Sequence, residues 1–152
     1  GANLDIDYDE YADGEALLGW LNCTARLSGS AFDGNDWLMR LVEILQRQLG
    51  QLGIEIAHLK MTLTPEQGND LCVVNAVSTD TPPVNPFRLH DVVQEGELIV
   101  NLRAEGDPDV LRREAISALT AQAADAGLAV TVEHLEHFRP GRPVPTHRVV
   151  MA

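Results

Sequence analysis

The 152-residue chain is 45% hydrophobic, 22% charged and 5% aromatic, which predicts a single globular domain with an aliphatic core. Its 23 acidic and 11 basic residues give a net charge of −12, which disfavours nucleic acid and anionic membranes and serves either solubility or the attraction of basic partners. No run approaches the roughly 20 apolar residues of a membrane span and no secretory signal is visible, so we expect a soluble, cytoplasmic protein. The chain opens Gly-Ala without a Met, and we interpret it as a piece of a longer protein.

The N-terminal part predicts a lead-in segment and then a strand. Residues 1–14 alternate acidic and apolar residues, and we interpret them as a lead-in. Over 15–27, apolar or small residues occupy every second position, which is typical of a strand with one buried face. Trp20 and Asn22 fall on the other face, where Trp20 either covers the sheet or supports a ligand.

A turn-rich joint over 28–34 precedes a predicted helix. Either Asn35 or Asp36 is suited to cap it, and the leucines and valine of 37–49 recur at helical spacing on one face. We therefore expect one helix over 37–49 with a single core-facing stripe.

Residues 53–64 form the most strand-like run of the chain and contain its only lysine, Lys60. The apolar positions change phase partway, so the strand is either buried on both faces or bulged near Ala57 and His58. His58 and Lys60 share one face. Either Lys60 extends to solvent at the rim of the sheet, or it faces a carboxylate or a ligand. We predict a polar pair of His58 and Lys60, with a carboxylate beside Lys60.

The second half of the chain predicts three further strands and a second helix. Asp107 is a suitable N-cap, Pro108 fits the first helical position, and Gly127 ends the helix, although Gln122 interrupts its apolar stripe. The expected elements are a strand over 71–77 that pairs with the preceding strand, a proline-rich surface loop over 80–96, a strand over 97–103, a helix over 108–126 and a last strand over 128–135.

The predicted fold is an α+β two-layer sandwich of the ferredoxin-like kind with one extra strand. Two strand-helix-strand crossovers with a hairpin strand between them give the order β-α-β-β-β-α-β. We place this domain at 15–138, followed by an extended tail rich in Pro and Arg at 139–152.

Motif searches favour no catalytic site. The chain contains no glycine-rich phosphate loop, dinucleotide-binding fingerprint, nucleophile elbow or zinc-protease helix. Cys23 and Cys72 are 49 positions apart in apolar runs, which indicates two buried, reduced thiols rather than a disulfide or a metal site.

Histidine and glutamate residues cluster near the end of the chain and suggest a divalent metal as the one possible cofactor. A strand places positions 134 and 137 on opposite faces, so both bind one ion only if the strand ends by 136. The alternative is that these side chains are structural or simply face solvent. The candidate metal ligands are Glu133, His134, Glu136, His137 and His147.

The tail also carries a resemblance to a known family. The run from His137 to Arg148, with the pattern F-x-P-x-x-P-x-P-T-H-R, resembles the terminal run of CobW-type P-loop GTPases, which are metal chaperones and proteins associated with cobalamin biosynthesis. Residues 57–60 resemble the hydrophobic-His-hydrophobic-Lys strand of the domain that follows their nucleotide-binding half, and residues 19–22 resemble the segment that enters it. The family's phosphate-binding loop, guanine-reading motif and CxCC motif have no counterpart here, so GTP hydrolysis is not implied.

The resemblance implies a non-catalytic, C-terminal interaction or regulatory domain. Its partner would be the N-terminal GTPase domain of the same protein or a client metalloprotein, and no cofactor is implied for this chain. The alternatives are an autonomous divalent-metal-binding module and a small ferredoxin-like enzyme that uses Lys60 and His58. We expect the isolated chain to bind neither GTP nor GDP. The tail either docks on an acidic surface or is a disordered terminus. The candidate partner-binding residues are Lys60, Arg139, Arg142, His147 and Arg148.

Overall fold

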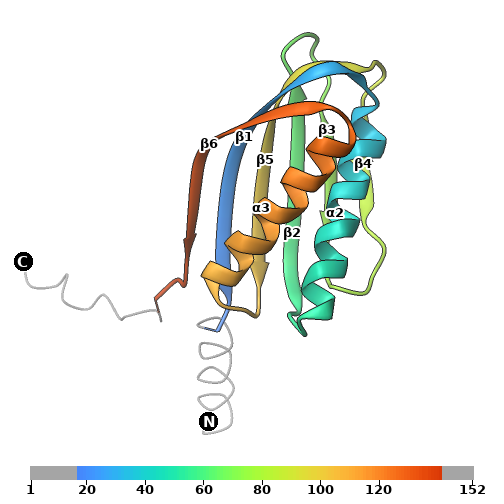
Figure 1. The fold of residues 1–152 in the computed structure, drawn as a ribbon. Helices are drawn as coiled ribbons and strands as arrows, with labels where there is room; N and C mark the ends of the chain where they lie inside the picture. The colour runs from blue at the N-terminus through green and yellow to red at the C-terminus, as the bar shows by residue number, and fades with distance from the viewer. Residues whose placement is uncertain (1–16, 142–152) are drawn as a thin grey trace, which may run out of the picture.

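A computed structural model describes residues 17–141, which form an α+β domain of two layers (Figure 1). One layer is a six-stranded, wholly antiparallel sheet in the order β4-β3-β2-β5-β1-β6, and helices α2 and α3 cover one of its faces. The elements are β1 (Gly19–Phe32), α2 (Gly34–Gln51), β2 (Ile56–Pro65), β3 (Cys72–Ala76), β4 (Val84–Phe87), β5 (Val93–Ala104), α3 (Pro108–Asp125) and β6 (Leu128–Phe138).

The core lies between the sheet and the two helices. Alternate side chains of β1, from Leu21 to Leu27, are almost completely buried, whereas the residues between them are half-buried. This is the period-2 pattern expected of a strand with one covered face, and the predicted two-layer sandwich is confirmed at this level. Neither helix of the described segment is long and apolar enough to cross a membrane.

Helix α2 begins earlier than the sequence suggested. Its N-cap is Asp33, whose carboxylate accepts a hydrogen bond from the backbone N–H of Asp36 at 3.1 Å. Asn35 instead holds a distant loop, because its side-chain amide donates to the Leu89 carbonyl at 2.8 Å and accepts from the Leu89 N–H at 2.7 Å. Asp33, Asn35 and Asp36 are all suited to cap the start of a helix. Asn35 does not do so, because its side chain is bonded to Leu89.

The two helices are joined by a reciprocal pair of buried hydrogen bonds. Trp37 Nε1 donates to the Gln122 carbonyl at 3.0 Å, and Gln122 Nε2 donates to the Trp37 carbonyl at 3.1 Å. Gln122 therefore does not weaken the apolar stripe of α3, because its amide N–H is satisfied inside the core.

Strand β2 is bulged where its apolar pattern changes phase. Its pairing with β5 shifts between Ile56 and His58, so Ala57 is the extra residue. After the shift, His58 lies opposite Arg103 and Lys60 lies opposite Asn101. Of the two alternatives for this strand, the structure has the bulge near Ala57.

The predicted loop over 80–96 is wrong in part, because it contains a sixth strand. Strand β4 pairs with β3 at the edge of the sheet, with Phe87 opposite Val73. Pro86 is tolerated there because an edge strand leaves one side of its backbone without a hydrogen-bonding neighbour. The predicted order with one extra strand therefore omitted β4. Strand β1 also continues beyond its predicted end to Phe32, and β6 continues to Phe138.

Cys23 and Cys72 are free and buried, as predicted. Desolvation by burial raises the pKa of both thiols. Because the thiolate is the reactive form, we expect both cysteines of the folded protein to react at least about 100-fold more slowly with a disulfide reagent at pH 8 than those of the unfolded chain. Absorbance at the leaving-group wavelength, with and without guanidinium, measures this. Equal rates in the two states would contradict the burial of both thiols.

Candidate functional site

The helices cover only one face of the sheet, so the other face is open, and cationic side chains gather on it. Because paired residues of adjacent strands project to the same face, the register places the side chains of His58 and Arg103 side by side. Lys60 lies one pair further along β2, between Asn101 on β5 and Asn75 on β3. These side chains are exposed or half-buried. They form a polar, cationic area in the middle of the open face.

This area is a shallow hollow with a volume of about 290 Å³. Directly opposite residues of an antiparallel pair have Cβ atoms roughly 5 Å apart, and diagonal neighbours roughly 7–8 Å. Arg103, His58 and Lys60 can therefore reach one bound group together. We call the hollow the cationic site; its lining residues are Trp20, Asn22, His58, Lys60, Asn101, Leu102 and Arg103.

Trp20 orients the guanidinium of Arg103. The Arg103 Cζ atom lies 4.0 Å from the centroid of the Trp20 ring, which is a cation–π contact. On its other side Trp20 meets Phe138, with ring centroids 5.7 Å apart. Trp20 Nε1 is buried and finds no acceptor among residues 17–141. Trp20 therefore lies between Arg103 and Phe138 on the open face of the sheet.

A chain of hydrogen bonds fixes the amides beside the site. Asn101 Nδ2 donates to Asn22 Oδ1 at 2.8 Å, and Asn22 Nδ2 donates to Glu136 Oε1 at 2.8 Å. The second carboxylate oxygen of Glu136 lies 3.8 Å from His134 Nε2. These bonds run across β5, β1 and β6 and hold the amide of Asn101 next to Lys60.

The basic residues of the cationic site are not neutralised by ion pairs in the described part of the chain. No ion pair within 4.0 Å is formed there by His58, Lys60 or Arg103, whereas Arg26 on the same face pairs with Glu66 at 2.7 Å. The predicted carboxylate beside Lys60 is therefore absent from residues 17–141, because the neighbouring positions on β5 and β3 are asparagines. Adjacent cations without counter-charges do not stabilise a sheet.

We therefore expect Lys60→Met to change the free energy of unfolding by no more than about 0.5 kcal/mol, as is usual for exposed positions. Leu59→Ala is the matched control, because Leu59 is fully buried and its truncation should cost about 2–5 kcal/mol. Urea denaturation followed by circular dichroism measures both. A loss of about 3 kcal/mol for Lys60→Met would instead indicate an ion pair.

Of the candidate metal ligands among residues 17–141, the structure brings His134 and Glu136 together. Because β6 continues to Phe138, His134 and Glu136 lie on the open face, while His137 faces the helix side. His137 Nδ1 lies 3.1 Å from Asp109 Oδ1, without the geometry of a hydrogen bond. Within residues 17–141 no three His, Cys, Asp or Glu side chains are grouped to hold a metal ion.

The tail falls largely outside the described residues. Arg139 Nη1 donates to the Leu17 carbonyl at 2.7 Å, which ties the end of β6 to the start of the domain. Of the other candidate residues, Arg142, His147 and Arg148 lie outside the described range, and the structure places none of them.

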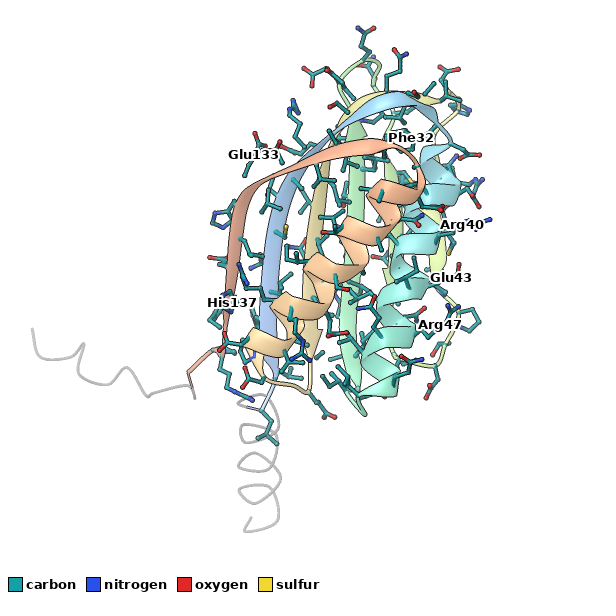
Figure 2. The ribbon with its side chains drawn as sticks, in the orientation of Figure 1. Phe32, Arg40, Glu43, Arg47, Glu133 and His137 are labelled. Atoms are coloured by element: carbon teal, nitrogen blue, oxygen red, sulfur yellow. The ribbon has the colours of Figure 1, made fainter. Side chains whose placement is uncertain are left out.

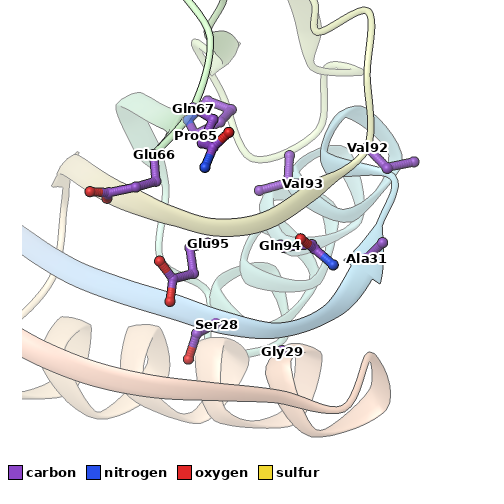
Figure 3. A pocket seen from close by; sticks show the side chains of 10 residues that line it. All are labelled: Ser28, Gly29, Ala31, Pro65, Glu66, Gln67, Val92, Val93, Gln94 and Glu95. Atoms are coloured by element: carbon purple, nitrogen blue, oxygen red, sulfur yellow. The ribbon is translucent and has the colours of Figure 1, made fainter.

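A larger hollow, of about 510 Å³, lies away from the cationic site at the end of the sheet where β1, the β2–β3 turn and the start of β5 meet (Figure 3). Its wall carries the carboxylates of Glu66 and Glu95 and the amides of Gln67 and Gln94. Glu66 is already paired with Arg26. Size alone favours this hollow, but the cationic site has the denser set of hydrogen-bond donors and the aromatic neighbour, and we regard it as the candidate functional site.

No protein-family model matches this chain, and no curated protein matches it. The crystal structure of a hydantoinase/carbamoylase family amidase from Burkholderia ambifaria is similar over 80% of this chain, with a TM-score of 0.49 and 12% sequence identity. The chain spans 28% of that amidase chain. A likeness at this level assigns neither a family nor an activity.

Arg103 and Asn101 are the site residues that the sequence analysis did not single out. Both lie in the strand predicted over 97–103, and both share its polar phase. The alternation of this strand therefore could have placed both residues on its polar face. Their position beside His58 and Lys60, however, depends on the pairing of β5 with β2, which the alternation of one strand does not specify.

Proposed function

We propose that this chain is a non-catalytic, partner-binding domain whose cationic site receives an acidic segment of another protein. One observation carries the proposal: His58, Lys60 and Arg103 are gathered on the open face and form no ion pair within 4.0 Å among the described residues, in a protein with a net charge of −12. Unpaired cations destabilise the free domain slightly and become favourable when a partner supplies the carboxylates.

The composition of the site supports a protein partner. Arginine forms bidentate hydrogen bonds with carboxylates, and the contact with Trp20 holds the Arg103 guanidinium ready for them. Trp and Arg are also the residues that most often dominate binding energy at protein interfaces. Apolar side chains flank the site on the same face, with Phe87 60% and Val84 59% exposed on β4. The partner segment that fits best therefore carries both acidic and apolar residues.

Catalysis by Lys60 and His58 is the less favoured alternative. Enzyme sites usually exclude water from the reacting groups, whereas Lys60 is exposed and the hollow around it is shallow. A flat, open sheet face is better suited to binding an extended surface than to sequestering a small substrate.

We further propose that the domain is a ferredoxin-like variant of the kind that follows the nucleotide-binding half of CobW-type GTPases. Strands β6, β1, β5 and β2 lie in the spatial order typical of that fold, with β3 and β4 as an added hairpin beside β2. On this proposal the acidic segment belongs to the GTPase half or to a client metalloprotein involved in metal or cobalamin delivery. The support is the sequence resemblance together with the topology.

Calorimetric titration of the chain with a short peptide of alternating Glu and Ala tests the partner-binding proposal. We expect micromolar to millimolar binding at low ionic strength that weakens steeply above 0.1 M salt, where the Debye length falls below about 10 Å. A Lys/Ala peptide of the same length is attracted by the net charge of −12 rather than by the site, so Lys60→Met should not weaken its binding. GTP and a single-stranded oligonucleotide are the phosphate-bearing alternatives. Tighter binding of either one, or no binding of the Glu/Ala peptide at low salt, would refute an acidic protein segment as the ligand.

A further inference from the structure

Strand β6 is a long edge that no described strand covers. It runs for 11 residues at one end of the sheet and pairs only with β1 within residues 17–141 (Figure 1). Most of its side chains are exposed, including Val132 and Phe138, which are 40% and 38% exposed. Glu133 and His137, two residues of this strand, are labelled in Figure 2. An edge strand offers unpaired backbone N–H and C=O groups to another strand.

The sequence of this edge is complementary to itself when it is reversed. In an antiparallel pair of two copies related by a two-fold axis at Leu135, each residue faces the one at an equal distance on the other side of 135. His134 is matched with Glu136 in this way, and both lie on the open face. Glu133 is matched with His137 by sequence but is the extra residue of a bulge, and Val132 and Phe138 lie on opposite faces of the sheet and do not meet.

We propose that two copies of the chain associate through antiparallel pairing of β6, with the two-fold axis at Leu135. Strand β6 pairs with β1 without a register shift between His134 and Phe138. The match nearest the axis, His134 with Glu136, therefore lies in regular strand. Each His134 imidazole then lies opposite the partner's Glu136 carboxylate on the open face. A neutral or a protonated imidazole can donate to that carboxylate. The two sheets would join into one continuous sheet.

Charges on an edge strand also serve to prevent association, and β6 carries a bulge at Glu133 that could act in the same way. Protective charges, however, work by repelling a second copy. Here each His134 faces the Glu136 carboxylate of the reversed copy, so the positions nearest the axis attract a second copy instead of repelling it. The inference is independent of the cationic site and of any acidic partner.

A charge-swap series on the full chain tests the proposal by sedimentation velocity. We expect the unchanged chain, of 16.6 kDa, to show a concentration-dependent monomer–dimer equilibrium. His134→Glu places like charges opposite each other and should weaken the dimer about tenfold or more. Glu136→Lys should weaken it likewise, whereas the double variant His134→Glu/Glu136→Lys restores opposite charges across the axis and should dimerise again.

Mixing the two single variants should produce a heterodimer, because each supplies the charge that the other lacks. Circular dichroism of each variant checks that the fold is retained, and Arg47→Glu on α2 is a control for the added negative charge of His134→Glu. A chain that stays monomeric at all accessible concentrations would overturn the proposal. So would a dimer that the single variants do not weaken or that the double variant does not restore.

Discussion

Trp37→Ala is expected to bring the domain close to its limit of stability. The Trp37 side chain is 4% exposed and packs edge-on against Phe32 with ring centroids 5.7 Å apart. Truncation of a buried aromatic residue costs about 3–5 kcal/mol, and the lost hydrogen bond to the Gln122 carbonyl adds roughly 1 kcal/mol. Since domains of this kind are stable by about 5–15 kcal/mol, this single change removes a large part of the total.

Urea denaturation followed by far-ultraviolet circular dichroism measures the effect. Trp37→Phe keeps most of the ring and loses the hydrogen bond, so we expect it to cost only about 1–2 kcal/mol. Trp20→Ala is the control on the open face, where half-burial predicts a much smaller loss. Equal losses for Trp37→Ala and Trp20→Ala would contradict the role of Trp37 as the link between α2 and α3.

Reversing the charges of the cationic site is expected to abolish binding of the acidic peptide. The double variant Lys60→Glu/Arg103→Glu replaces two side chains that attract the carboxylates of the peptide with two that repel them. Because each loss of about 1.4 kcal/mol weakens binding tenfold, the double variant should bind at least about 100-fold more weakly. The fold should persist, since both side chains are exposed and neither forms an ion pair with the described residues.

The control for this variant is Arg47→Glu/Arg112→Glu, which changes the net charge by the same amount. Arg47 and Arg112 are exposed on α2 and α3, the helices on the covered side of the sheet, and Arg47 is labelled in Figure 2. We expect this pair of changes to weaken binding only slightly, through the long-range field. Similar losses in the two double variants, measured by calorimetry at low salt, would show that net charge rather than the site governs binding.

The parts of the fold that could be predicted are those with local causes. Helix α3 begins where expected because Asp107 caps it and Pro108 opens it, and it ends before Gly127, whose φ of 69° suits glycine. The change of apolar phase in β2 indicated either a strand buried on both faces or a bulge near Ala57 and His58, and the structure has the bulge. Each of these signals lies within a few residues of its effect.

The parts that could not be predicted depend on contacts between distant segments. Strand β4 could not be predicted because it contains Pro86, and proline is tolerated only in an edge strand. The sequence alone does not show which strand lies at the edge. The side chain of Asn85 supports it by donating to the Val73 and Phe87 carbonyls. In the same way, the cationic site exists only because β5 lies between β1 and β2. Strand order and register are tertiary properties that no short stretch contains.

Two indole N–H signals offer the most direct measurement of ligand binding at the cationic site. The chain has two tryptophans: Trp20 lines the site beside Arg103, and Trp37 is buried and bonded to the Gln122 carbonyl. In nitrogen-15 correlation spectra recorded during titration with the Glu/Ala peptide, the Trp20 indole signal should shift saturably while the Trp37 signal stays in place. Trp20→Phe assigns the two signals. A Trp20 signal that remains unmoved at saturation, or larger shifts for Trp37 than for Trp20, would contradict binding on the open face of the sheet.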